Sequence, residues 1–100
     1  MGASAKTADF LLASRLRQAA TGQTDALYEL GVAYSSGSGV ELDLVEAHKW
    51  FNLAALSGDR RAQVCRAEIA DEMSAREIAE AQRAARAWLA AREPARRLAA

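Results

Sequence analysis

The sequence has very few of the residues from which reactive or cross-linked sites are built. It contains one cysteine, Cys65, one histidine, His48, and one proline, Pro94. A single cysteine excludes an internal disulfide, and zinc would need further ligands at short spacing, which are missing. A nucleophile also needs a positioned base, and nothing local orients Cys65 toward His48, which we expect at the surface or partly covered. We therefore predict no catalytic residue, no metal site and no cofactor.

The chain also lacks net charge, since 13 basic and 13 acidic residues cancel. Proteins that bind nucleic acid or anionic membranes usually carry a basic excess, so neither partner is expected. The apolar run Phe10-Leu11-Leu12 is too short for a signal peptide or a membrane span. With a single cysteine, which is compatible with a reducing compartment, these features predict a cytoplasmic protein.

Charge is nevertheless segregated along the chain. Between Arg17 and His48 there is no Lys or Arg, whereas Asp and Glu occur five times. From Arg76 onward six arginines accompany three glutamates. One interpretation is solvated helix faces, and the alternative is head-to-tail association of acidic and basic ends.

Residues that favour strands or interrupt helices are scarce as well. Val occurs four times and Ile twice, whereas Ala occurs 25 times among the 100 residues. Ala is the best helix former, so the composition predicts an all-α fold. Because few large apolar side chains remain, the core must be thin and closely packed. The length is that of one domain.

What the chain does contain is a helical hairpin. In segment 24–36, Leu27, Leu30 and Tyr34 recur at helical spacing, and Thr24 is expected to cap the helix. Gly31 lies mid-helix, where it costs about 1 kcal/mol relative to Ala. This cost favours a second helix that crosses closely there, and a tolerated glycine is the alternative.

A glycine-rich turn and a second helix follow. The turn, residues 35–39, has neither the preceding strand nor the further motif residues of a phosphate-binding loop. Asp43-x-x-Glu46 resembles a capping box. Trp50 and Phe51 are the bulkiest adjacent pair, and we expect them to anchor the core against the first helix at Leu30 and Tyr34.

The hairpin carries small and aromatic residues at fixed offsets. These residues are Ala26, Leu30, Gly31, Tyr34, Gly37, Gly39, Asp43, Ala47, Trp50, Phe51, Ala54, Ala55 and Gly58. The pattern resembles the Sel-one-like repeat family, which belongs with the tetratricopeptide-like helical repeats. The resemblance implies antiparallel helix pairs stacked into a right-handed superhelix, and proteins that act mostly as adaptors rather than as enzymes.

The flanking segments resemble partial copies of this unit. Gly22 and Gly58 end similar segments, and Ala26, Gly31 and Tyr34 correspond to Ala62, Ala67 and Ala70. In the first helix Phe10, Leu11, Leu12, Leu16 and Ala19 or Ala20 are expected to face inward. Asp59 should cap the helix that holds Ala62, Ala67 and Ala70. A capping box at Ser74-x-x-Glu77 should start the last helix and Pro94 should end it.

We therefore predict an α/α superhelix, a short solenoid of about five helices. Their approximate ranges are 7–21, 24–36, 43–57, 59–73 and 75–93. One full repeat at 23–58 lies within a single domain, 7–94, between a mobile leader (1–6) and a frayed tail (95–100). The flanking helices either cap a monomer or pair between two chains of a homodimer.

A protein or peptide partner is the expected ligand, and its identity is not encoded. We call the first helix of each helix pair the first-position helix. In each first-position helix, the side opposite the packing face would line a concave groove. Its candidate residues are Asp25, Tyr28, Glu29, Val32, Ser35, Arg61, Val64 and Glu68. Tyr28 could instead pack on the first helix. The two functions that fit are a groove-binding adaptor and a self-associating structural subunit that pairs through its terminal helices.

Overall fold

The chain folds into five α-helices, with no strand over the residues that the structure describes. A computed structural model describes the backbone of residues 2–99 and the side chains of residues 7 and 9–92. The helices are α1 (Gly2–Ala20), α2 (Thr24–Ser36), α3 (Leu44–Leu56), α4 (Arg60–Ala70) and α5 (Ala75–Ala99). The all-α prediction is confirmed.

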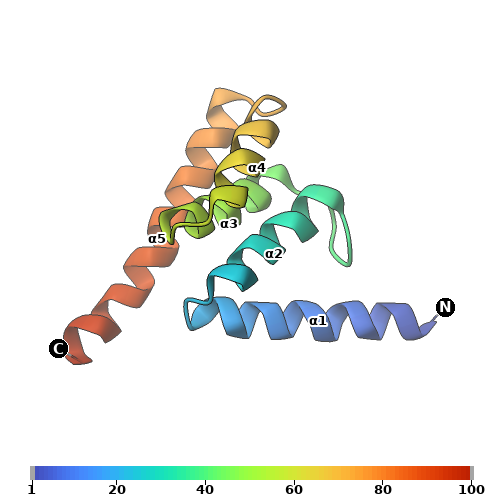
Figure 1. Ribbon diagram of the computed structural model, residues 1–100, viewed down its shortest axis with the longest axis horizontal. Helices are drawn as coiled ribbons and strands as arrows, with labels where there is room; N and C mark the ends of the chain where they lie inside the picture. The colour runs from blue at the N-terminus through green and yellow to red at the C-terminus, as the bar shows by residue number, and fades with distance from the viewer. Residues whose placement is uncertain (1, 100) are drawn as a thin grey trace.

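The helices stack as a short solenoid around α3. Helix α3 packs against α2, α4 and α5, whereas α1 packs mainly on α2. Helices α2 and α4, which hold equivalent positions in successive pairs, also touch, as do α3 and α5. Figure 1 shows α1 extending along one side of α2 while the C-terminal part of α5 projects from the body. Helices α4 and α5 pack together less closely than α2 and α3, because α5 lies on α3 and makes few contacts with α4.

Helices α2 and α3 meet at Gly31. A Cβ atom built on Gly31 would lie 2.4 Å from Cδ1 of Phe51, so the phenyl ring occupies the space that a side chain would need. The predicted close crossing is confirmed. The glycine is required because any larger residue would displace Phe51 from the core.

Trp50 and Phe51 are both buried, as predicted, but they face different helices. The ring of Phe51 lies 5.8 Å from that of Tyr28 on α2. The ring of Trp50 lies edge-on to that of Trp88 on α5, at 5.9 Å. Adjacent positions on a helix point about 100° apart, so the two rings join α3 to two neighbours at once.

The predicted helix caps are mostly present. The side chain of Asp43 accepts a hydrogen bond from the backbone N–H of Glu46, and that of Asp59 accepts from the N–H groups at the start of α4. Ser74 and Glu77 form both halves of the capping box. The prediction for Thr24 is wrong, since the N-cap residue of α2 is Gln23 and its side chain makes no capping hydrogen bond.

Three helix boundaries differ from those expected. Helix α1 begins at Gly2 rather than near Thr7, and α4 ends at Ala70. Helix α5 continues through Pro94 to Ala99. Proline removes one helical hydrogen bond, yet the alanines and arginines after it favour helix strongly. None of the helices, over the described residues, combines the length and hydropathy that a membrane span requires.

The expected inward face of α1 is largely wrong. Phe10 is 67% exposed, and Leu11 and Leu16 are exposed as well, while Ala19 is buried and Leu12 partly buried. Almost all contacts of helix α1 are with α2, so only a narrow stripe of α1 is covered. This leaves an apolar surface on α1 without a packing partner in the described chain.

The second copy of the first-position helix keeps only part of its predicted packing. Ala62 is fully buried, like its counterpart Ala26. Ala67, the counterpart of Gly31, is exposed, because α5 packs against α3 and does not cross α4 closely. The connection between α4 and α5 is short, as the loss of the glycine turn predicts.

Candidate functional site

The predicted groove residues lie on the outer surfaces of two neighbouring helices. On α2, Asp25, Glu29 and Val32 are exposed, while Tyr28 and Ser35 are half-buried. On α4, the remaining three candidates, Arg61, Val64 and Glu68, are exposed. Because α2 and α4 are in contact, the two sets form parts of one surface.

Arg61 joins the two parts of this surface. Its guanidinium donates to Asp25 at 2.9 Å and to Asp59 at 2.8 Å, and its Cζ atom lies 4.1 Å from the ring centroid of Tyr28. The hydrogen bond from Arg61 holds the pKa of the Asp59 carboxyl below its ordinary value. The two acidic side chains in turn raise the pKa of Arg61.

Tyr28 belongs partly to the core and partly to the surface. Its ring packs against Phe51 on one side and beneath Arg61 on another, and burial raises the pKa of its hydroxyl. The aromatic partner of Tyr28 is thus on α3. A ring held between two neighbours has little freedom left to lose on binding.

A hollow of about 240 Å³ lies beside Tyr28 between α1 and α2. Its lining residues are Arg15, Tyr28, Glu29, Val32, Ala33 and Ser38. The side chains of Arg15 and Glu29 form an ion pair at 3.2 Å across the two helices. Three of the predicted groove residues therefore share a concavity. Val64 and Glu68 do not line it and stand on the adjoining surface of α4.

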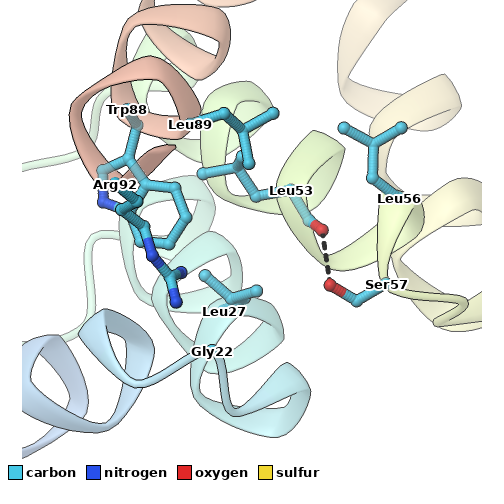
Figure 2. Close-up of a pocket in the computed structure, with 8 residues that line it drawn as sticks. All are labelled: Gly22, Leu27, Leu53, Leu56, Ser57, Trp88, Leu89 and Arg92. Atoms are coloured by element: carbon cyan, nitrogen blue, oxygen red, sulfur yellow. Dashed lines mark hydrogen bonds between the residues drawn. The ribbon is translucent and has the colours of Figure 1, made fainter. Parts of the chain in front are cut away.

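A larger hollow, of about 450 Å³, was not foreseen from the sequence. We call it the leucine pocket, and Figure 2 shows its lining residues: Gly22, Leu27, Leu53, Leu56, Ser57, Trp88, Leu89 and Arg92. These residues come from the α1–α2 connection, α2, the end of α3 and α5. The one local signal was Trp88 with Arg92 four positions later, whose guanidinium carbon lies 4.5 Å from the indole centroid.

His48 is buried, so the prediction that it lies at the surface or is partly covered is wrong. Its exposed fraction is 4%, and its Nδ1 atom has no hydrogen-bond partner among the described residues. Helix α3 is covered by α2, α4 and α5, which leaves it little solvent-facing surface. Burial and the nearby guanidinium of Arg66 lower the pKa of His48. A neutral imidazole buried between packed helices is typical of a residue that contributes to packing.

The described residues offer no cluster of three or more metal-ligating side chains. Cys65 is a free, half-buried thiol on α4.

Comparison with known families gives a match for the central hairpin. The family model for the Sel1 repeat matches residues 24–59. The chain carries a Sel1 repeat. The match begins with α2 and ends at Asp59, the cap of α4, so it covers the whole α2–α3 hairpin and confirms the resemblance drawn from the motif.

Sel1 repeats are in general modules of protein–protein interaction, and the family is typically non-catalytic. No curated protein and no solved structure gives a significant match to this chain.

Proposed function

We propose that this Sel1 repeat protein is a non-catalytic adaptor that binds a peptide segment of a partner protein over α2 and α4. A cytoplasmic location, which the single cysteine favours, is part of the same proposal. The observation that carries it is the surface around Tyr28, where an immobilised aromatic ring borders a hollow.

The surface has the composition of a binding site. Val32 on α2 is 38% exposed and lines the hollow beside the half-buried ring of Tyr28. Val64 on the adjoining helix α4 is 58% exposed. The Arg15–Glu29 and Arg61–Asp25 ion pairs stand at its margin. Apolar centres with polar rims are typical of protein interfaces, where aromatic anchors contribute most of the affinity.

Val32→Glu is the sharpest test of this proposal. The side chain is exposed, so the substitution should leave the helices folded while it places a charge in the apolar centre. Proteins captured by the wild type from its source cell and absent with Val32→Glu would be the groove partners. Gln82→Glu, which adds the same charge at an exposed position on α5, is the control and should capture the wild-type set.

Circular dichroism must show the same melting curve for both variants. Capture of an identical set of proteins by Val32→Glu and by the wild type would refute binding through this surface.

Self-association is the second candidate function, and the uncovered apolar face of α1 favours it. Phe10 is 67% exposed and Leu11 is 42% exposed, a surface that pairing of terminal helices would cover. Sedimentation at two protein concentrations tests this candidate. A mass that does not depend on concentration would remove it.

A further inference from the structure

The leucine pocket is lined by both apolar and polar groups and is open to a side chain from outside. Leu27 and Leu53 form its fully buried floor, while Leu56 and Leu89 stand at its rim with exposed fractions of 66% and 39%. Figure 2 shows Trp88 and Leu89 of α5 facing Leu53 across the opening. Its volume lies in the range of ligand pockets, about 300–1,000 Å³. An apolar side chain placed there would cover the exposed leucines.

Arg92 places a positive charge at this opening. Its guanidinium stacks on Trp88, and a Cβ atom on Gly22 would lie 3.3 Å from its Nη2 atom. Among the described side chains no carboxylate pairs with Arg92. The pocket therefore fits a group that combines a large apolar side chain with a carboxylate next to it.

The chain itself presents such a group in the turn between α2 and α3. Leu42 is 56% exposed there, and its neighbour Glu41 is exposed and makes no ion pair with any described side chain. Both residues lie within the stretch from Arg17 to His48 that has no Lys or Arg. Arg92 belongs to the basic C-terminal segment. The two elements are complementary in charge, and the turn offers an exposed leucine side chain to the pocket.

The turn holds Leu42 in place before any binding occurs. Gly37 and Gly39 adopt left-handed conformations, at φ 72° and 78°, and the backbone N–H of Asp43 donates to the carbonyl of Tyr34 at 2.9 Å. A Cβ atom built on Gly37 would lie 3.4 Å from the Cβ atom of Leu42, so Leu42 sits close against the glycine turn. A preorganised loop loses less entropy when it docks.

The turn cannot reach the pocket of its own chain. Gly22 precedes α2 and the turn follows it, so the 13 residues of this helix separate them by about 20 Å at 1.5 Å per residue. Figure 1 shows the α1–α2 connection and the α2–α3 turn at opposite ends of α2. The occupant must come from another molecule.

We propose that Leu42 of one copy occupies the leucine pocket of a second copy, with the carboxylate of Glu41 bound to the guanidinium of Arg92. The contact is heterologous, because a turn meets a pocket. Each copy therefore keeps one free turn and one free pocket, and association extends head to tail into oligomers that lengthen with concentration.

Sedimentation velocity from micromolar to millimolar protein tests the contact. The average mass of the wild type should rise above that of the monomer with concentration. Leu42→Ser removes the apolar group of the turn, and Arg92→Glu places a like charge opposite Glu41. Each variant alone should stay monomeric over the whole range. A wild type that stays monomeric, or variants that associate like the wild type, would overturn the proposal.

Mixing the two variants distinguishes head-to-tail contact from other modes. Leu42→Ser keeps an intact pocket and Arg92→Glu keeps an intact turn, so an equimolar mixture should form 1:1 dimers and nothing longer. The double variant Glu41→Arg/Arg92→Glu reverses the ion pair and should recover concentration-dependent mass. A mixture that remains monomeric would exclude this interface.

Two controls separate this contact from the other surfaces. Val32→Glu alters the groove and should associate like the wild type, whereas Phe10→Ser tests pairing through α1 and should also have no effect. Loss of association in Phe10→Ser alone would transfer the interface to the terminal helices and overturn the proposal. Circular dichroism should show the same helical content for every variant.

Discussion

The carboxylate of Asp25 on α2 and the guanidinium of Arg61 on α4 form an ion pair at 2.9 Å. The two residues are 36 positions apart, which is also the offset between Gly22 and Gly58. The bond thus joins equivalent positions of two successive copies of the first-position helix. Arg61 also covers Tyr28 and bonds to Asp59, so a single side chain links the repeat to the cap of the next helix.

The two acidic partners of Arg61 should differ in their contribution to stability. Asp59 is nearly buried and caps α4, so Asp59→Ala should lower the free energy of unfolding by about 1 kcal/mol. The side chain of Asp25 is 85% exposed. Asp25→Ala should change the free energy of unfolding little, because exposed ion pairs are screened. Urea denaturation of both variants measures the difference. An equal loss in the two variants would contradict the distinction.

Gly31→Ala should destabilise the hairpin by about 1–3 kcal/mol, the usual cost of overpacking a core. The added methyl group would stand 2.4 Å from the ring of Phe51. Phe51→Leu should reduce the clash, so the double variant should lose less than the sum of the two single losses. Chemical denaturation of the four proteins gives this coupling. Strict additivity would mean that the methyl group does not meet the ring.

His48 should make stability depend on pH. Its pKa in the folded protein lies below the ordinary value of 6.5, so the unfolded chain binds a proton first as pH falls. The stability that the neutral imidazole contributes is complete above pH 6.5 and is lost as pH falls from 6.5 toward the lower folded value. The groups concerned are His48 on α3 and Arg66 on α4.

The measurement for His48 is the free energy of unfolding at several pH values between 5 and 8. His48→Leu removes the titrating group and should flatten the curve in this interval. Because carboxylates are unchanged in the variant, their contribution cancels in the comparison. Identical slopes for the variant and the wild type would show that His48 titrates normally.

Trp88→Ala should detach α5 from α3 by removing the ring that meets Trp50 at 5.9 Å. We expect a loss of about 3 kcal/mol, the lower end for truncation of a large aromatic residue, because Trp88 is only half-buried. Trp88→Phe keeps an aromatic ring and should lose less. Hydrogen exchange should speed up in α5 more than in the α2–α3 hairpin. Equal acceleration across the molecule would indicate global unfolding instead.

Part of the candidate surface was predictable, because helical spacing gives the face on which a residue lies. Asp25, Glu29 and Val32 stand on the exposed side of α2, as that spacing indicates. The leucine pocket was not predictable, since Leu27, Leu53 and Leu89 approach one another only when three helices pack. The spacing of these leucines along the sequence does not indicate that they lie close together in the fold.

The sequence by itself determined the elements whose contacts are local. The caps at Asp43 and Asp59, the Ser74–Glu77 box and the left-handed Gly37 depend on atoms a few residues apart, and the chain specifies them directly. Gly31 opposite Phe51 also followed from the sequence, because a mid-helix glycine is costly unless a second helix needs its space.

Only the tertiary structure decided how many neighbours each helix has. Helix α3 has three, which buries His48 and turns Trp50 toward Trp88, whereas α1 has essentially one, which leaves Phe10 exposed. Burial is the sum of contacts from segments distant in the chain. An amphipathic pattern shows which side of a helix is apolar, but the width of the covered face depends on the packing of the other helices.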